Sequence, residues 1–273
     1  MRWVPLLLLL AGCGPRVLFR GEEPVFGAVF VVQQGSQRAL RFGHPDAEDQ
    51  SIYDLARPDH EPLGYVRTAL LALAHAGHPR RLLMIGLGGG SYLRHVRRLA
   101  PDMALEAVEI NPLVVQVCRR YFTLPRGTVV RVEDGRRFVQ QAGSKHQRYD
   151  VVFIDAYDAV DYPLHLGTRQ FFAEVARILA PGGVVVANLS PNTDRTRDNL
   201  ARTFLHVFPV AICLTAGSGN TVLLGRRGPG PTGPEVVARI RRLEQKSHGR
   251  YGLIGAARRR CVLDLHDARL LQD

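Results

Sequence analysis

Strands and helices alternate through the middle of this chain of 273 residues, and this alternation limits its fold more than any other feature. Short apolar runs of strand-like composition are followed in turn by amphipathic runs with apolar residues at helical spacing. Because successive strand, helix and strand form βαβ units, the order predicts an α/β fold whose parallel sheet is covered by helices on both faces. We expect strands at residues 81–85, 104–110, 128–132, 149–154 and 184–188, and helices at residues 91–99, 112–122, 136–142, 168–179 and 193–207.

Two β-rich segments flank this alternating region. Residues 24–42 contain two such runs around QQGSQ, and residues 210–214 and 221–224 flank AGSGN, so each segment predicts a hairpin. A further helix is expected at residues 61–76, where GHP ends it. The chain then divides into a signal segment (1–13), a small N-terminal β-domain (24–62), a Rossmann-like domain (63–226), and a C-terminal part (227–273) with a linker, an amphipathic helix at 235–247 and a basic tail.

The first 13 residues are typical of a bacterial lipoprotein signal. Arg2 supplies a positive charge, residues 4–10 are apolar, and the sequence LAGC, which ends at Cys13, matches a lipobox. If the lipobox is used, a lipid on Cys13 anchors the protein to a membrane of the cell envelope. The alternatives are a misassigned start codon or an apolar N-terminus that packs on the domain, and the protein is then cytoplasmic.

The charge balance is basic, with 36 Lys and Arg against 25 Asp and Glu and a net charge of +11. Such a charge could attract nucleic acid or an anionic membrane surface. The basic residues are nearly all arginines, however, and they are scattered among acids without the interleaved aromatic residues that a single-strand binder uses. We therefore expect no nucleic-acid partner.

Cysteine and histidine spacing gives no sign of a disulfide framework or a metal site. Cys118, Cys213 and Cys261 are odd in number, far apart in the chain and form no CxxC pair, so we expect buried thiols. The ten histidines show neither HxxxH nor HExxH spacing. No metal is expected.

Four successive strand ends carry glycines or acids. In an open parallel sheet, ligands bind outside the carboxyl ends of the strands, so these residues should meet at one site. Glycines allow a ligand to approach the backbone closely, and the free N–H groups of the following helix face it. The residues at the four ends are Gly86, Gly88 and Gly90, then Glu109, then Asp134 with Gly135, and finally Asp155 followed by Tyr157, Asp158 and Asp161.

This pattern predicts a nucleoside site. Glu109 follows Gly86 by 23 residues, a spacing that suits a carboxylate on the ribose hydroxyls, and Asp134 could accept from the adenine amine. The loop has no GK[ST], which argues against a triphosphate. A dinucleotide fits the loop and Glu109 alone, but the acidic loop after Asp155 favours a cationic S-adenosyl sulfonium compound.

Taken together, the motifs resemble the spermidine synthase (aminopropyltransferase) family over about residues 25–225. The resemblance rests on Gln50, on HEPLGY with Glu61 and Tyr65, and on the segments PRRLLMIGLGGGSYLRHV, VEIN, VEDGRRF, YDVVFIDAYD, LGTRQFF and LAPGGVVVANL. It implies an S-adenosylmethionine methyltransferase-like Rossmann sheet with a terminal reversed strand, preceded by a small β-domain, and it suggests a homodimer.

The resemblance also implies an activity and roles for individual residues. An amine would attack the aminopropyl carbon of decarboxylated S-adenosylmethionine and release methylthioadenosine. Glu109 would hold the ribose and Asp134 the adenine, while Asp155, helped by Asp158, would take the proton of the attacking amine. Cofactor contacts are expected from Gln50, Gly86, Gly88, Gly90 and Gly135, and substrate contacts from Tyr65, Tyr157 and Asp161.

One position departs from the family pattern. Members that make spermidine usually carry GGGDGG in the glycine loop, and Gly89 stands here at the place of the acid. A glycine would remove the repulsion of a ligand carboxylate and leave room for it, so S-adenosylmethionine itself is a second candidate ligand. Three hypotheses follow: an aminopropyltransferase for an amine still to be identified, an S-adenosylmethionine-dependent methyltransferase, and a membrane-anchored nucleoside-binding module without catalysis.

Overall fold

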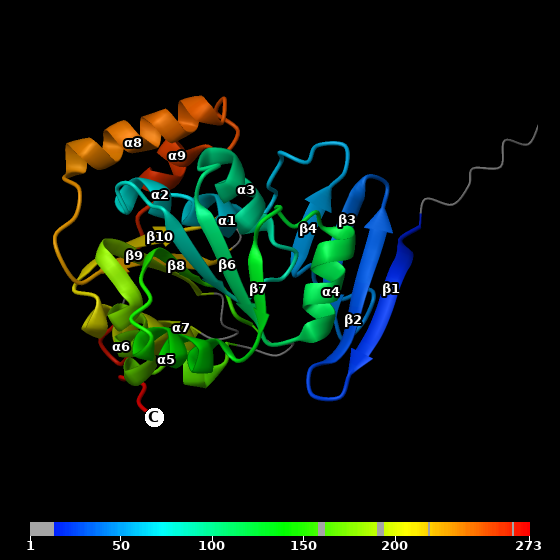
Figure 1. The fold of residues 1–273 in the computed structure, drawn as a ribbon, viewed down its shortest axis with the longest axis horizontal. Helices are drawn as coiled ribbons and strands as arrows, with labels where there is room; N and C mark the ends of the chain where they lie inside the picture. Colours follow the sequence, from blue (N-terminus) through cyan, green and yellow to red (C-terminus); the bar gives the residue numbers. More distant parts are fainter. Residues whose placement is uncertain (1–13, 158–161, 190–193, 218, 264) are drawn as a thin grey trace, which may run out of the picture.

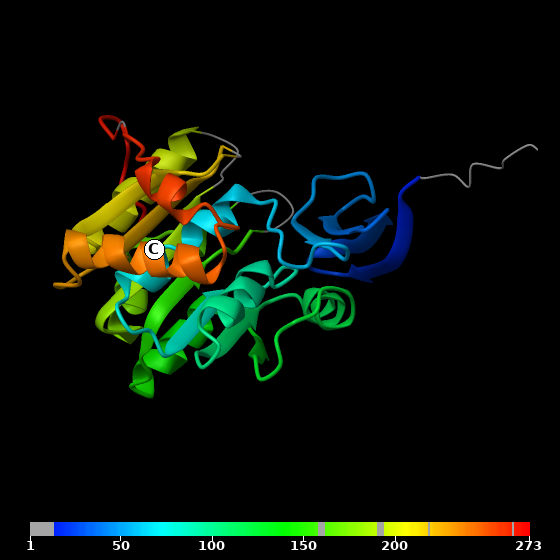
Figure 2. The same ribbon diagram turned by 90° about the horizontal axis from the view of Figure 1, so that it is seen from above.

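The computed structural model describes residues 14–157, 162–189, 194–217, 219–263 and 265–273 (Figure 1). The predicted signal segment with Cys13 lies outside the described residues, and so do two predicted site residues, Asp158 and Asp161. The described residues form a small sheet near the N-terminus and a larger sheet against which the helices pack (Figure 2). None of the helices in the described ranges is long and apolar enough to cross a bilayer.

The small sheet has four antiparallel strands in the order β1-β2-β3-β4. β2 and β3 correspond to the hairpin expected at residues 24–42. The sequence pattern did not indicate the other two strands, because β1 is an edge strand with few buried side chains and β4 is only four residues long. The strands are β1 (Arg16–Glu23), β2 (Gly27–Gln34), β3 (Gln37–Phe42) and β4 (Ser51–Asp54).

The larger sheet has seven strands in the order β10-β11-β9-β8-β5-β6-β7, which confirms the α/β fold with a Rossmann-like sheet. Five strands are parallel, while β11 is antiparallel to both of its neighbours, β9 and β10. The reversed strand is therefore the last in the sequence but lies inside the sheet. The strands are β5 (Arg81–Ile85), β6 (Ala104–Glu109), β7 (Val129–Val132), β8 (Tyr149–Ile154), β9 (Leu179–Leu189), β10 (Val210–Thr215) and β11 (Thr221–Arg226).

Helices cover both faces of the larger sheet, and a separate apolar core lies between each face and its helices. The first core contains residues of α1 (Gly64–Ala69), α2 (Ala72–His75), α3 (Ser91–Leu99), α4 (Pro112–Tyr121), α8 (Gly233–Lys246) and α9 (Leu253–Arg258). The second contains residues of α5 (Gly135–Ser144), α6 (Arg169–Ile178) and α7 (Asp194–Val207), with the 3-10 turn at Leu164–Leu166.

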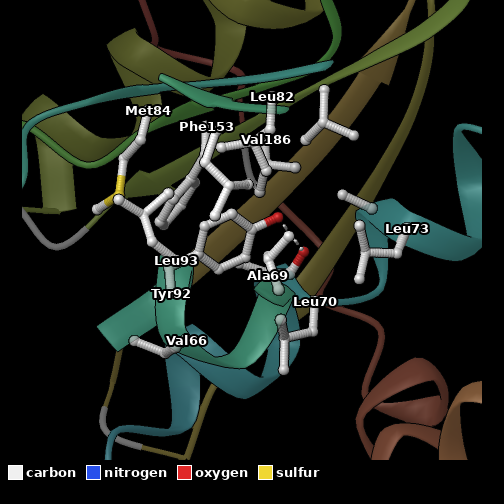
Figure 3. Packing of buried hydrophobic residues seen from close by; sticks show 14 of the residues in the cluster. Val66, Ala69, Leu70, Leu73, Leu82, Met84, Tyr92, Leu93, Phe153 and Val186 are labelled. Carbon is white, nitrogen blue, oxygen red and sulfur yellow. Dashed lines mark hydrogen bonds between the residues drawn. The ribbon is translucent and has the colours of Figure 1, made fainter. Parts of the chain in front are cut away.

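Tyr92 fixes the helix that follows the glycine loop. Its ring lies 4.4 Å from that of Phe153 in β8, and its hydroxyl donates to the carbonyl oxygen of Ala69 at 3.4 Å (Figure 3). Tyr92 is 1% exposed, and such burial of an aromatic ring contributes about 2–3 kcal/mol. Because α3 is held against both β8 and α1, the loop before it has a defined position.

The helix expected at residues 61–76 begins later and is interrupted. α1 starts at Gly64, because the preceding Leu63 N–H donates to the side chain of Glu61 at 2.9 Å instead of joining a helical turn. A short gap then separates α1 from α2. The later start leaves the Glu61 carboxylate free to contact other elements of the fold.

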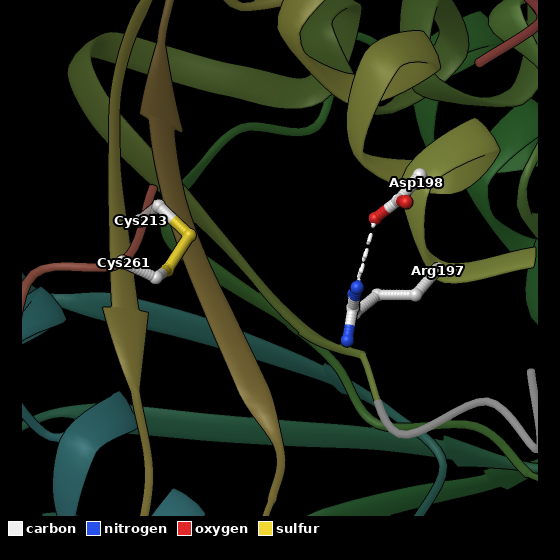
Figure 4. The surroundings of a disulfide bond; sticks show 4 residues. All are labelled: Arg197, Asp198, Cys213 and Cys261. Carbon is white, nitrogen blue, oxygen red and sulfur yellow. Dashed lines mark hydrogen bonds and ion pairs between the residues drawn. A yellow bond between two sulfur atoms is a disulfide. The ribbon is translucent and has the colours of Figure 1, made fainter. Parts of the chain in front are cut away.

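The expectation of three thiols was wrong for two of the cysteines. Cys213 of β10 and Cys261 form a disulfide across a sequence separation of 48, whereas Cys118 is a buried free thiol (Figure 4). The segment after α9 returns to β10, where Leu214 and Arg260 form an isolated bridge. Residue spacing could not show this pairing, because it depends on how the C-terminal part folds back onto the sheet.

Candidate functional site

The ends of neighbouring parallel strands lie close together at one edge of the larger sheet. The Gly86 N–H donates to Val108 O, Asp155 N–H to Ile85 O, and Glu133 N–H to Glu109 O, at 2.8–3.1 Å. We call this region the carboxyl edge and define it as residues 86–90, Glu109, Asp134, Gly135, Asp155 and Asn188. The sequence-predicted residues of four different strand ends therefore meet on one side of the sheet.

The backbone of the glycine loop approaches its neighbours too closely for side chains. Gly86 has a φ of +85°, and a Cβ there would lie 2.2 Å from Asp155 O. A Cβ on Gly88 would lie 2.8 Å from the Ser51 hydroxyl, and one on Gly90 3.1 Å from the Cys118 sulfur. The loop therefore requires glycine at these positions, and its close contacts hold it in shape.

Glu109 holds the glycine loop from the end of β6. One carboxylate oxygen accepts from Leu87 N–H at 2.8 Å and the other from Asn111 N–H at 2.9 Å. Burial raises the pKa of Glu109, although these backbone hydrogen bonds oppose the shift. Each oxygen has a second lone pair, so the same carboxylate can also accept from the hydroxyls of a ribose.

Asp134 caps α5 at the end of β7. One carboxylate oxygen accepts from Arg137 N–H at 2.9 Å, and the other lies 2.9 Å from His165 Nε2. The next residue, Gly135, packs so closely against β5 that a Cβ would lie 2.5 Å from Ile85 Cγ2. Asp134 thus has a structural role as a cap while it stands beside the start of the glycine loop.

Asp155 follows β8 at the carboxyl edge and is held by polar side chains. Asn188 Nδ2 donates to its carboxylate at 2.9 Å, and Tyr65 provides a further hydrogen bond. Burial raises the pKa of Asp155 to about 6, hydrogen bonds from Asn188 and Tyr65 oppose the shift, and the negative charge of Glu61 adds to it. At pH 7 the group is mostly ionised and has an affinity for a proton that suits a general base.

Aromatic and amide side chains surround Asp155. Tyr157 donates from its hydroxyl to Asn188 O at 2.8 Å and packs edge to face with Tyr162 at 5.5 Å. The pKa of Tyr65 is raised by burial and by the charges of Asp155 and Glu61, so its phenol stays protonated and can donate. Asn188 and Tyr65 thus orient this carboxylate, and Tyr157 holds Asn188.

Glu61 belongs to a buried chain of polar groups. Its carboxylate lies 3.0 Å from His95 Nε2, and His95 Nδ1 lies 2.8 Å from the Tyr251 hydroxyl. Burial lowers the pKa of His95, although Glu61 opposes the shift. This chain connects the region beside Asp155 with the C-terminal part of the protein.

The small sheet reaches the glycine loop through Ser51. Its hydroxyl accepts from Gly89 N–H at 2.8 Å. The neighbouring Gln50 donates its backbone N–H to Leu40 O, and its side chain makes no hydrogen bond within the described ranges. Gln50 is therefore placed near the loop without being engaged by another side chain.

The space on the Cβ side of Gly89 is filled by other side chains. A Cβ at Gly89 would lie 2.8 Å from Ser51 Cβ and 3.0 Å from Phe122 Cδ1, so the space beside it is filled. Below the loop, the buried Arg94 donates to Phe122 O and Gly89 O. The lack of a side chain at Gly89 thus lets Ser51 of the small sheet approach the glycine loop closely.

Three residues of this region were not among the predicted site residues. Asn188 ends a buried apolar strand, and the same rule of strand ends that identified Asp155 would have found it. His165 stood near the acidic loop, but its pairing with Asp134 depends on a tertiary contact. Ser51 gave no signal, since its role comes from a different sheet.

No group of three or more His, Cys, Asp or Glu that could hold a metal is found in the part of the chain that the structure describes. The side chains at and beside the carboxyl edge include carboxylates, amides and tyrosines. These groups bind cations and accept protons.

Comparison with known proteins identifies relatives of this chain. The model of the spermine/spermidine synthase domain matches residues 67–209. A polyamine aminopropyltransferase of Vibrio vulnificus is 31% identical over an alignment of 235 residues, and the match covers 81% of this chain and 78% of the relative.

Solved structures share the fold. A probable spermidine synthase from Corynebacterium glutamicum has a TM-score of 0.66 at 20% identity, and the match covers 92% of this chain and 97% of that protein. Human methyltransferase-like protein 13, in complex with SAH, has a TM-score of 0.61 at 24% identity, with 68% and 92% covered. The methyltransferase-like fold expected from the sequence is confirmed.

Proposed function

This chain belongs to the spermine/spermidine synthase family, and on that premise we propose that it transfers an aminopropyl group from decarboxylated S-adenosylmethionine to an amine, in polyamine biosynthesis. The nucleoside occupies the carboxyl edge. Glu109 accepts from the ribose hydroxyls, Asp134 lies at the adenine end, and residues 86–90 and Gly135 let the ligand approach the backbone.

The transfer requires an amine with a free lone pair. An alkylammonium must first lose a proton, and the Asp155 carboxylate takes it. The amine nitrogen then bonds to the methylene carbon beside the sulfonium, the carbon–sulfur bond breaks, and methylthioadenosine leaves as a neutral thioether. A positioned base of this kind contributes roughly 10²–10⁴ in rate, and apposition of amine and carbon contributes further.

The observation that carries this proposal is the environment of Asp155. It stands at the end of β8 beside the glycine loop, its pKa is raised to about 6, and Asn188 fixes its orientation. Tyr65 and Tyr157 flank it as substrate contacts. Asp158 and Asp161, outside the described residues, would add negative charge for a polyamine.

The acids near Asp155 also favour the decarboxylated ligand. Glu61 and Asp155 place negative charge beside the site, which attracts the ammonium of an aminopropyl group and repels a carboxylate. We therefore expect binding of decarboxylated S-adenosylmethionine to be stronger than that of S-adenosylmethionine.

Product analysis tests this function. The purified protein is incubated with each of the two sulfonium compounds and a panel of diamines and polyamines, and the products are identified by mass spectrometry. Methylthioadenosine with an aminopropylated amine is the expected result. S-adenosylhomocysteine would instead identify a methyltransferase, and the absence of any product with intact nucleoside binding would identify a binding module.

A matched pair of variants tests the role of Asp155. We expect Asp155→Asn to lower kcat by roughly 10²–10⁴ while nucleoside affinity is retained, since the amide cannot take a proton. Asp150→Asn is the control, because Asp150 is an acid at the opposite end of the same strand, where it accepts from Arg80 and Arg81 N–H. Equal effects of the two substitutions on kcat would remove Asp155 from the mechanism.

For localisation we propose a lipid anchor on Cys13. The lipobox supports it, and so does the disulfide between Cys213 and Cys261, because disulfides persist mainly in oxidising compartments outside the cytosol. Labelling with radioactive palmitate should be lost in Cys13→Ala. A protein recovered in the cytosol with its first residues intact would refute the anchor.

We also propose that the protein forms a homodimer, as the family membership suggests. Size-exclusion chromatography with light scattering should give about twice the 30.3 kDa mass of one chain. A mass equal to one chain at micromolar concentration would contradict this.

A further inference from the structure

A cavity of about 430 Å³ lies between the larger sheet and the two C-terminal helices, where Val184 in the middle of β9 lines it. Val184, Leu214 and Leu224 form an apolar floor, while α2, α8 and α9 supply the walls. The cavity is thus separate from the carboxyl edge. We call it the arginine pocket, after the four arginines that line it: Arg226, Arg241, Arg258 and Arg260.

The four arginines differ in exposure, since Arg226 is half-buried whereas Arg241, Arg258 and Arg260 are exposed to solvent. No acidic side chain of the described residues lines it, and within the described ranges none of the four guanidinium groups makes a hydrogen bond or an ion pair. The Nη1 atom of Arg226 is buried without any partner. An unpaired buried donor costs about 1–3 kcal/mol or more if charged, so a partner from outside would relieve this cost.

The pKa of His75 responds to the positive charge of these arginines. His75 lines the pocket, and its pKa is lowered to about 4 by burial and by the charges of Arg226 and Arg260. A neutral imidazole at pH 7 leaves the arginines as the source of positive potential. The apolar floor and the charged lining are therefore two distinct parts of one site.

We propose that the arginine pocket binds an amphipathic anion, with one hydrocarbon chain on the apolar floor and a carboxylate or phosphate headgroup on the arginines. Ligand pockets of about 300–1,000 Å³ are typically apolar with a few placed polar groups, and this cavity fits that description. Guanidinium groups pair with carboxylate and phosphate oxygens through two parallel hydrogen bonds. This site is independent of the aminopropyl transfer proposed above.

The first test uses laurate as the probe on the full chain. Calorimetric titration below the critical micelle concentration should give saturable binding with one laurate per chain. Dodecyltrimethylammonium has a similar hydrocarbon chain but a cationic headgroup. It should bind at least about tenfold more weakly, because the arginines repel that headgroup. Equal binding of both probes would overturn the proposal.

Variants locate the binding. Arg226→Gln with Arg260→Gln should weaken laurate binding by about tenfold or more, since charge-assisted contacts are lost. Arg242→Gln is the matched control, as an exposed arginine of the same helix α8 that does not line the pocket. Val237→Trp, which fills the cavity from a half-exposed position, should weaken laurate binding without removing an arginine.

Further measurements distinguish an anion in the pocket from a membrane surface or a second copy of the chain. If laurate fails to bind while vesicles of phosphatidylglycerol do, the arginines contact a membrane surface and the pocket proposal is wrong. A change of oligomeric state in Val237→Trp, without laurate binding to the unsubstituted chain, would indicate a second copy instead. Laurate affinity should be unchanged in Asp155→Asn, so a failure of the aminopropyl transfer and a failure of this proposal give different results.

Discussion

At the carboxyl edge, each buried or half-buried carboxylate already has protein partners. Glu109 accepts two backbone N–H groups, Asp134 caps a helix and pairs with His165, and Asp155 accepts from Asn188. In the arginine pocket, the charged groups have none within the described ranges, and Arg226 keeps a buried nitrogen unpaired. The comparison teaches that the acids of one region are already held by protein partners, whereas the other region keeps basic groups without a protein partner in the described ranges, one of them with a buried unpaired nitrogen.

The disulfide beside the arginine pocket should give the largest effect on stability. Replacing both Cys213 and Cys261 by serine should lower the free energy of unfolding by about 4 kcal/mol, because the unfolded chain loses a constraint over a 48-residue separation. Urea unfolding measures this, and a reductant should leave the double variant unchanged. An equal loss of nucleoside affinity would show that the two regions are not independent.

The glycine loop offers the next test, at the carboxyl edge. Gly86→Ala should cost at least about 3 kcal/mol and abolish nucleoside binding, because it combines a positive φ with a backbone clash. Gly182 has a φ of +72° but open space around it, so Gly182→Ala should cost only about 1–2 kcal/mol. Similar losses in both variants would mean that the loop is looser than its contacts indicate.

The Asp155 carboxylate should lower the stability of the fold at neutral pH. Its pKa is about 6 when folded and lower when unfolded, so ionisation between about pH 4 and 6 lowers the free energy of unfolding. Asp155→Asn should therefore be more stable at pH 7.5 by roughly 2–3 kcal/mol, since one pKa unit is worth about 1.4 kcal/mol.

The pH dependence provides the check on that prediction. The stability difference between Asp155→Asn and the unsubstituted chain should disappear below about pH 4, where the carboxyl is protonated in both states. Turnover should fall as the pH drops through about 6. A stability difference that stays constant from pH 4 to 7.5 would contradict the raised pKa.

Asp134 should give the smallest effect and separate its two roles. Asp134→Ala should lower the free energy of unfolding by about 1 kcal/mol through loss of the helix cap, whereas Asp134→Asn keeps a good cap and should change it little. Thermal unfolding measures both. If the two variants also bind nucleoside as tightly as the unsubstituted chain, Asp134 is a cap only.

The central fold could be predicted because its signals are local. The strand at residues 149–154 and the helix at residues 91–99 were predicted with the bounds that the structure shows, since each has a strong pattern and a clear end. The same local rule placed Gly86, Glu109 and Asp155 at strand ends. Strand ends converge by the geometry of a parallel sheet, so the composition of the site followed without knowledge of side-chain contacts.

What escaped prediction depends on contacts between distant segments. The disulfide needs the C-terminal part to return to β10, and the arginine pocket needs arginines of β11, α8, α9 and the segment after α9 to line one cavity. The β1 strand, which is mostly exposed on the edge of its sheet, lacks the buried alternation that would identify it. Such features belong to tertiary packing, which no window along the sequence contains.

The hydrogen bond from Gly89 to Ser51 has a consequence for protein engineering and for evolution. A chimera that takes its first sixty residues from a relative would place a different residue at position 51 against the glycine loop of this chain, and a bulkier residue there would displace the loop. Positions 51 and 89 should therefore change together, and recombination between relatives should succeed most often when both come from the same parent.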